Sequence, residues 1–174
     1  FDWRQGESAP TTITTTRRYR MAAQVSGSRV AWAEYTGGYW QVFAWNEGDS
    51  SPQQITSDSG SKQDLRLSGD RLAWRSHSTA TNATEVWTWQ FGDSSPTRLS
   101  GAGTSGEANL WVSGDRVVWS ANRGSYRQIF TWKTGDNEVT QITNDSFNHY
   151  TPHVSGDRVV WRARGNDGRR HIFT

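Results

Sequence analysis

One eight-residue word occurs four times along this chain, and this internal repeat limits the possible folds more than any other feature. Each copy reads Val/Leu-Ser-Gly-Ser/Asp-Arg-Val/Leu-Ala/Val-Trp, and the copies begin at Val25, Leu67, Val112 and Val154. The spacings between copies are 42, 45 and 42 residues, measured at Trp32, Trp74, Trp119 and Trp161. Such a period indicates a small structural unit that buries its apolar face only by stacking on its neighbours.

Each unit reads as four short strands, which we call a, b, c and d. Strand a ends before a Ser-Gly turn, where glycine is free to adopt a positive φ, and strand b is β-branched and aromatic. A second tryptophan word forms strand c, and a Gly-Asp turn leads to strand d. These two strands occupy 42–45, 86–89 and 129–132, and then 54–56, 98–100 and 141–143. We therefore expect an all-β propeller of four-stranded antiparallel blades, with about four blades in this chain.

The composition agrees with a core built from stacked sheets. Hydrophobic residues make up only 33% and the mean hydropathy is −0.83, but there are 11 tryptophans, each of which buries a large area. Cysteine is absent, so no disulfide or thiolate site is available. The net charge of +2 comes from mixed charges, which predicts no nucleic-acid partner. No apolar run reaches the roughly 18 residues that a membrane span needs.

The words resemble the TolB-type, WD40-like propeller repeats of bacterial and archaeal cell-surface and periplasmic proteins. The resemblance rests on Val154-Ser155-Gly156-Asp157-Arg158-Val159-Val160-Trp161, Ile172-Phe173-Thr174, Gly135-Asp136 and Gln141-Ile142-Thr143, and extends over essentially the whole chain. It implies a propeller in an extracellular, cell-surface or periplasmic location. It implies no particular activity, because propellers support many functions.

The two ends of the chain read as parts of one blade. Phe1-Asp2-Trp3 matches the end of strand c and Thr12-Ile13-Thr14 matches strand d, whereas His171-Ile172-Phe173-Thr174 lies in another strand c. We therefore expect a single propeller domain over 1–174, with its terminal blade split between the N- and C-termini. The split blade comprises 1–16 and 151–174, and the complete blades are 22–56, 64–100 and 109–143.

Three arrangements are compatible with a split blade. The chain closes on itself as four blades, or belongs to a larger propeller of roughly six to eight blades. In the third arrangement, copies join head to tail, which produces rings or filaments. The sequence leaves this choice open.

Residues that recur in every unit are expected to serve the unit. The strand-b tryptophans should fill the wedge between blades, and Trp45, Trp89 and Trp132 should pack near the rim. The turn aspartates lack the Asp-x-Asp-x-Asp spacing of a calcium loop and should bond to backbone: Asp49, Asp70, Asp93, Asp115, Asp136 and Asp157. Neighbouring blades should offer carboxylates or carbonyls to the strand-b arginines: Arg29, Arg71, Arg116 and Arg158.

The units differ in their d-to-a and b-to-c loops, which emerge on one face around the mouth of the central channel. These loops are rich in Tyr, Trp, Arg and Asn, which recognition surfaces favour. We predict that the ligand-binding residues of this variable-loop face are Arg18, Tyr19, Tyr35, Tyr39, Trp40, Asp64, His77, Glu107, Arg123, Tyr126, His149 and Tyr150.

Catalysis has little support in the sequence. There is no Gly-x-Ser-x-Gly nucleophile turn, and the four histidines lack the spacing of metal ligands. We predict no catalytic residue, no metal and no cofactor, and favour a noncatalytic role while leaving enzymatic activity undecided.

The leading hypothesis is an extracellular recognition module that binds a protein or a glycan through the variable-loop face. One alternative is a structural subunit of a surface layer or filament, assembled head to tail by blade completion. Another is a glycan-active enzyme with Asp64, Glu107 and Glu34 at the channel mouth.

Overall fold

The fold is taken from a computed structural model, which describes residues 9–79, 81–100, 104–165 and 167–174. Within these ranges the regular structure is entirely β, and the strands form four antiparallel sheets. We call these sheets blades one to four, in chain order. The all-β prediction is therefore confirmed for the described residues.

The first three blades have four strands each, and the fourth has three. Blade one comprises β1 (Arg20–Ser26), β2 (Arg29–Thr36), β3 (Tyr39–Asn46) and β4 (Gln53–Gln54). Blade two comprises β5 (Gly60–Ser68), β6 (Arg71–Ser78), β7 (Ala83–Gln90) and β8 (Thr97–Arg98). Blade three comprises β9 (Ser105–Ser113), β10 (Arg116–Arg123), β11 (Tyr126–Lys133) and β12 (Thr140–Gln141). Blade four comprises β13 (His149–Ser155), β14 (Arg158–Arg164) and β15 (Arg170–Phe173).

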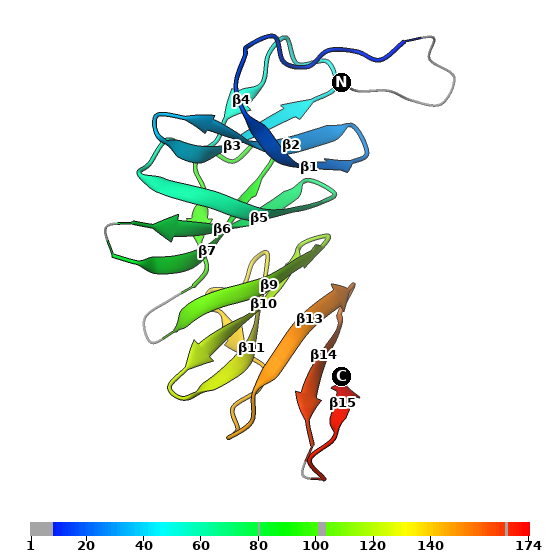
Figure 1. The fold of residues 1–174 in the computed structure, drawn as a ribbon. Helices are drawn as coiled ribbons and strands as arrows, with labels where there is room; N and C mark the ends of the chain where they lie inside the picture. The colour runs from blue at the N-terminus through cyan, green and yellow to red at the C-terminus, as the bar shows by residue number, and fades with distance from the viewer. Residues whose placement is uncertain (1–8, 80, 101–103, 166) are drawn as a thin grey trace.

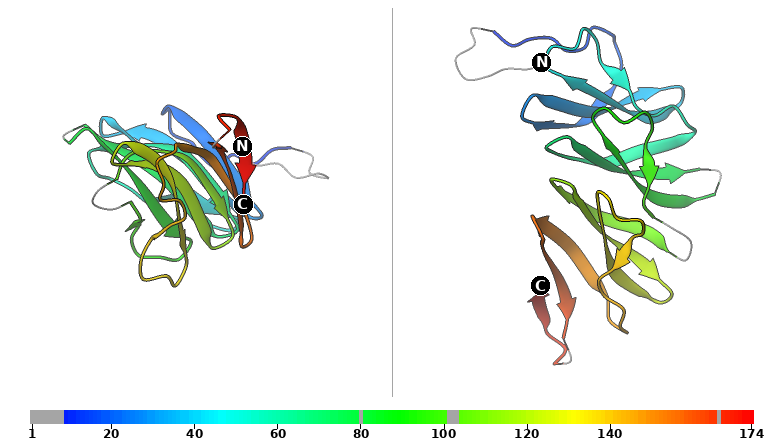
Figure 2. Two further views of the ribbon diagram at one scale, coloured as in Figure 1. Left: turned by 90° about the horizontal axis from the view of Figure 1, so that it is seen from below. Right: turned by 180° about the vertical axis from the view of Figure 1, so that it is seen from behind.

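The four blades follow one another in an open arc, with blades one and four at its opposite ends (Figures 1 and 2). The sheets do not close into a ring, so the four-bladed closed arrangement is not observed. Phe1-Asp2-Trp3 lies outside the described residues, and in the described part of the chain β15 has no strand on its outer edge. The split terminal blade therefore stays a prediction.

Two-residue turns join strands a and b, as the repeated Ser-Gly step predicts. In blade one, Ser26 pairs with Arg29, and Gly27 between them has a φ of 59°. The first turn position has a positive φ in the other three blades as well, and the second does not, which is the pattern of a type II′ hairpin.

Strand-b tryptophans fill the space between blades. Trp74 of blade two packs against Ala31, Ala33 and Val42 of blade one, and it is 1% exposed. Trp119 of blade three packs in the same way against small and branched residues of blade two, and it is equally buried. A large ring faces small side chains at each junction, which lets the two sheets interlock at native density. The predicted packing role is confirmed for these residues.

A β-bulge interrupts strand a in all four blades. At each bulge one residue that is not glycine has a positive φ of 50–55°: Ala22, Asp64, Asn109 and Thr151. Strand a continues beyond this bulge, so it begins two to four residues before the predicted blade bounds, at Arg20, Gly60, Ser105 and His149. The bulge also changes which face the residues before it occupy, because it inserts one extra residue into the alternation.

Candidate functional site

The blades are aligned so that all their Ser-Gly turns lie on the same side of the arc, at corresponding ends of the strands. The serine of each turn accepts a hydrogen bond from the turn glycine of the next blade: Ser26 Oγ from Gly69 N at 2.8 Å, Ser68 Oγ from Gly114 N at 3.0 Å, and Ser113 Oγ from Gly156 N at 3.2 Å. We call this the turn end. The d-to-a and b-to-c loops lie at the opposite end of the same strands, which we call the loop end.

The Gly-Asp turns also lie at the turn end, and each is held by hydrogen bonds within its own blade. Asp49, Asp93 and Asp136 each accept a hydrogen bond from a strand-c backbone N–H at 2.9 Å, as predicted. The second tryptophans each donate Nε1–H to the backbone oxygen of the turn aspartate, over 3.0–3.2 Å: Trp45, Trp89 and Trp132. These repeated residues therefore hold their own turns.

The aspartates of the Ser-Gly turns behave differently from the prediction. They contact side chains rather than backbone: Asp70 accepts from Gln90 Nε2 at 2.8 Å, Asp157 from Arg116 Nη2 at 3.1 Å, and Asp115 lies 3.7 Å from Lys133 Nζ. The serine makes the backbone contact instead, and that contact runs between blades.

Within the described residues, the strand-b arginines of blades one to three reach the next blade, as expected, and one of the three meets a carboxylate there. Arg116 binds Asp157 of blade four. Arg29 and Arg71 instead stack over aromatic rings of the next blade, Phe91 and Trp132, each at 5.3 Å.

At the loop end of blade one, Glu34 binds two arginines. Its carboxylate accepts from Arg18 Nη1 at 3.1 Å and from Arg20 Nε at 2.7 Å, and it is buried. The Tyr35 ring lies edge-on to Trp40 at 5.5 Å, and the backbone of Tyr35 bonds to that of Tyr19. The structure thus brings Arg18, Tyr19, Tyr35 and Trp40 together, while Tyr39 is half-buried at the start of β3.

In blade two, the predicted Asp64 is bound by Arg75, whose Nε lies 2.6 Å from Oδ2. Arg75 also donates to the backbone oxygen of Glu107 in blade three, at 2.6 Å, so the pair links two blades. His77 is half-buried, with Nδ1 3.4 Å from Thr84 Oγ1.

Glu107 and His149 do not reach the surface as the prediction required. Glu107 is 2% exposed and His149 is 5% exposed. Both ring nitrogens of His149 are used, because Nε2 lies 2.8 Å from Asp145 Oδ1 and Nδ1 accepts from Trp161 Nε1 at 2.9 Å. These two residues are therefore not part of the exposed surface of the loop end.

The carboxylate beside His149 has a shifted pKa. Burial raises the pKa of Asp145, but the hydrogen bonds from His149 and from the backbone N–H of Phe147 outweigh it, so the pKa lies below the ordinary value. The Asp145–His149–Trp161 contact thus fixes the d-to-a loop onto blade four.

Exposed tyrosines gather at the loop end. They are Tyr19 at 79%, Tyr35 at 44%, Tyr126 at 39% and Tyr150 at 37%. Arg123 is also exposed, at the end of β10 and across the strand pair from Tyr126. Of the residues predicted from the sequence, the exposed ones at the loop end thus include four tyrosines and Arg123.

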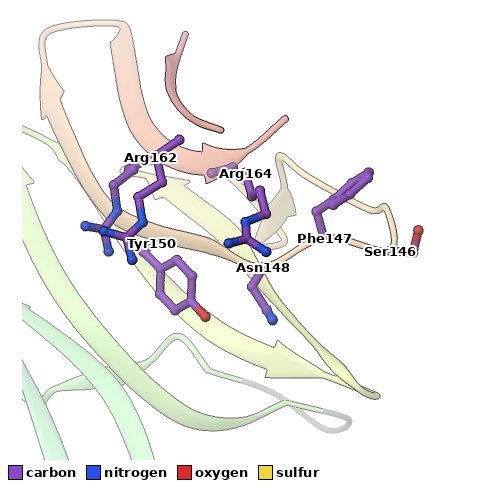
Figure 3. A pocket seen from close by; sticks show the side chains of 8 residues that line it. Ser146, Phe147, Asn148, Tyr150, Arg162 and Arg164 are labelled. Carbon is purple, nitrogen blue, oxygen red and sulfur yellow. The ribbon is translucent and has the colours of Figure 1, made fainter. Parts of the chain in front are cut away.

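A cavity of about 480 Å³ opens on blade four beside Tyr150. Figure 3 shows the side chains of Arg162, Arg164, Tyr150 and Asn148 turned toward this space. Arg170 also lines it. These three arginines are not among the residues predicted from the sequence, although Arg162 and Arg164 alternate along strand b at the positions where blade one has Ala33 and Tyr35.

The acidic residues do not form an obvious reaction centre. Arginines bind Glu34 and Asp64, and Glu107 is buried. Among the described residues, no group of three His, Asp or Glu side chains is placed to hold a metal ion. In the same part of the chain, no helix is long and apolar enough to cross a membrane.

No protein-family model matches the chain, and no curated protein matches it in sequence. Its fold is similar to solved structures of propellers. Acylaminoacyl peptidase of Pyrococcus horikoshii matches with a TM-score of 0.62 at 10% identity, over 87% of this chain and 25% of that chain. TolB of Acinetobacter baumannii matches with a TM-score of 0.56 at 14% identity, over 96% of this chain and 46% of that chain.

A third similar structure is the β-propeller domain of the Trilobed protease from Pyrococcus furiosus, which has an open velcro topology. It matches with a TM-score of 0.59 at 10% identity, over 92% of this chain and 52% of that chain. The chain therefore spans about a quarter to a half of the length of these proteins. At such low identity the similarity shows the β-propeller repeat fold and nothing of the activity.

Proposed function

We propose that this chain is a noncatalytic recognition module that binds a protein partner through its loop end. The observation that carries the proposal is the exposure of four tyrosines there, in three of the four blades. Tyrosine offers a large, rigid and amphipathic contact area and is enriched in protein interfaces. The turn end, by contrast, is occupied by bonds that repeat from blade to blade.

A location outside the cytoplasm, in the periplasm or at the cell surface, belongs to this proposal. It is supported by the resemblance of the repeat words to TolB-type repeats and by the fold similarity to TolB. A glycan is the alternative ligand, because tyrosine rings also stack on sugars.

The test uses the immobilised chain with extracts of the cell envelope. A variant with Tyr19, Tyr35, Tyr126 and Tyr150 changed to Ser should lose the captured partner. A control variant, Val25→Ser with Asp157→Ser, changes exposed residues at the turn end and should retain it. Capture that survives the tyrosine changes would place recognition elsewhere, and binding on a glycan array in place of protein capture would change the partner class.

A second candidate function, head-to-tail self-association, is favoured by a bond pattern between strands c and d. In each four-stranded blade a strand-d residue donates its N–H to a strand-c oxygen at 2.8 Å: Ile55 to Val42, Leu99 to Val86, and Ile142 to Ile129. The backbone N–H of that same strand-c residue donates in turn to the side-chain hydroxyl of the next strand-d residue, at 2.9 Å. The residues with these hydroxyls are Thr56, Ser100 and Thr143.

The chain contains one further copy of the strand-d pair and one further copy of the strand-c residue, and the two copies lie near opposite ends of the sequence. Ile13-Thr14 repeats the strand-d pair, and Ile172 stands at the strand-c position on β15, where it is 73% exposed. Ile13 lies beside Val30 and Trp32 of blade one, much as Ile55 packs against the junction of blades one and two. Addition of Ile13-Thr14 from one copy to β15 of another would continue the arc by β-augmentation.

Blade completion is tested by light scattering on Ile13→Pro, which removes the donating N–H, and Thr14→Val, which removes the hydroxyl. Both should reduce any assembly to monomers. The control Thr56→Val breaks the same bond inside blade one and should leave the mass of the assembly unchanged. Assembly that persists in Ile13→Pro would exclude this contact.

A further inference from the structure

We infer that His149 is a pH-dependent switch at the loop end of blade four: its neutral ring holds Trp161, and its protonation releases Trp161. The switch is independent of the proposed function, because every measurement below uses the chain without a partner. Two hydrogen bonds define it. Nδ1 of His149 accepts from Trp161 Nε1 at 2.9 Å, and Nε2 lies 2.8 Å from Asp145 Oδ1.

The bond from Trp161 fixes the protonation state of the histidine. An indole N–H can only donate, so Nδ1 of His149 carries no proton in this contact. The proton of the neutral ring is then on Nε2, which donates to Asp145. In the protonated ring both nitrogens are donors, and an Nδ1–H would face the indole N–H. Protonation therefore breaks the bond to Trp161 and keeps the bond to Asp145.

Blade two contains a cation at the same repeat position. Lys62, like His149, stands six residues before the serine of its Ser-Gly turn, and each has an aspartate four residues earlier, Asp58 or Asp145. The Lys62 ammonium donates to Asp58 and has no acceptor to offer. The strand-b tryptophan of that blade, Trp74, has a buried Nε1 without a hydrogen-bond partner among the described residues. Blade two thus shows the arrangement that we expect for blade four when His149 is protonated.

The contact lies in the junction between blades three and four. His149 is 5% exposed, and Trp161 occupies the strand-b position whose tryptophans pack against the preceding blade at the two earlier junctions. Because His149 is buried, loss of the bond requires Trp161 or the start of β13 to move. Tyr150 is the next residue of β13 and is exposed at the loop end, so a movement there changes that surface.

Asp145 keeps its charge while the histidine titrates. Burial raises the pKa of Asp145, but the hydrogen bond from His149 and that from the backbone N–H of Phe147 outweigh it, and the pKa lies below its ordinary value. Histidine ordinarily changes charge between pH 5 and 8, where such a carboxylate is ionised. The bond between Asp145 and His149 therefore persists on both sides of the transition, and the bond to Trp161 is the one that changes.

Two other histidines of blade four need separate control. His171 lies on the same face as His149, because both pair with Ala163, and its Nε2 lies 2.9 Å from Asp167 Oδ1. His153, further along β13, contacts a tryptophan ring of blade three, with the ring centres 4.4 Å apart. Neither of them has a hydrogen bond to the indole of blade four within the described residues.

The charged side chains of the neighbouring strands are placed away from His149. On β14, Arg162 and Arg164 alternate with Ala163 and so lie on the opposite face. Those of blade three bond within that blade, lie on its face toward blade two, or lie at the turn end beside Asp157: Arg127, then Glu107 and Arg123, then Arg116 and Lys133. Asp145 is therefore the one charged partner of His149 among the described residues.

The test follows the indole N–H signal of Trp161 by NMR, in the whole chain labelled with 15N-tryptophan, from pH 8 to pH 5. The variant Trp161→Phe identifies the signal. As the pH falls, the signal should move with one inflection toward the position of an indole without an acceptor. Its hydrogen exchange, corrected for the intrinsic effect of pH, should become roughly two- to ten-fold faster. A signal that stays constant over this range would overturn the switch.

Three variants assign the change to His149. His149→Gln keeps an acceptor for Trp161 and a donor for Asp145 but cannot titrate, so the signal should stay at the neutral position throughout. His149→Lys reproduces blade two and should place the signal at the acid position already at pH 8. The matched control His171→Gln should titrate like the parent. A parent-like change in His149→Gln, or its loss in His171→Gln, would show that another group titrates, and these two variants decide the matter even if His149→Lys does not fold.

Discussion

At the scale of single residues, the strand-a bulge explains where sequence reasoning about the site succeeds and where it fails. Simple alternation along β13 would place Tyr150 on the face toward blade three and His149 outside. The bulge at Thr151 reverses this, so His149 is buried against Trp161 and Tyr150 is exposed beside Arg162. Only two of the four bulge residues are of the Asn or Asp type that tolerates a positive φ, so the bulge leaves no regular sequence signal.

The bulge makes a testable prediction about stability in blade one. Ala22 has a φ of 55°, which costs a residue with a Cβ about 1–2 kcal/mol. Ala22→Gly should therefore raise the free energy of unfolding, by about 1 kcal/mol. Ala23→Gly, one residue later and without a positive φ, should lower it by about 0.5–1 kcal/mol. Urea denaturation measures both, and equal losses would show that Ala22 is not strained.

The lowered pKa of Asp145 predicts a pH dependence. Its folded-state pKa lies below the ordinary 3.8, so its ionisation stabilises the fold above that value, and this contribution is lost as pH falls through the folded-state pKa. Asp145→Asn should therefore be less stable than the parent at neutral pH, and the difference should shrink in acid. Thermal melts across this range measure the difference. A difference that is constant with pH would mean that the Asp145 charge contributes nothing.

At the scale of the elements, the sequence predicts the blades well because the strand and turn patterns recur from unit to unit. The turns and the strand-b tryptophans follow from residue type and position alone. The inter-blade contacts could not be predicted, because they depend on how one sheet is placed on the next. The Ser-Gly word carries such a contact, between a serine hydroxyl and the glycine N–H of the following blade.

This contact predicts different effects for two copies of the same serine. Ser68 Oγ accepts from Gly114 N at 3.0 Å, so Ser68→Ala should lower stability by about 0.5–1.5 kcal/mol. Ser155 occupies the same position in blade four, where no hydrogen bond to its hydroxyl is found within the described residues. Ser155→Ala should therefore be nearly neutral. Chemical denaturation compares the two, and equal losses would assign the effect to the turn rather than to the junction.

The three cavity arginines show a different limit of sequence reasoning. Arg162 and Arg164 lie on strand b, which the repeat marks as structural, while Arg170 lies on strand c. Their alternation indicates one shared face, but nothing in the sequence shows that nearby carboxylates are already bound to histidines. The sequence signal for Arg162 and Arg164 is the difference between the copies, because blade one has Ala33 and Tyr35 at the same strand-b positions.

At the scale of the whole molecule, the described blades form an open arc, and two roles are proposed for the chain. Recognition would use the loop end, where tyrosines are exposed in three of the four blades, whereas blade completion would pair blade one of one copy with β15 of another. The exposed tyrosines favour the first role, and the repeated strand-d pattern at Ile13-Thr14 supports the second.

The solution mass of the chain, measured by light scattering over a wide concentration range, separates these roles most directly. Recognition of a different protein, without self-association, predicts a monomer of 19.6 kDa throughout. A stable multiple of that mass that persists on dilution and is abolished by Ile13→Pro would contradict this account, because the chain would then assemble with itself by blade completion.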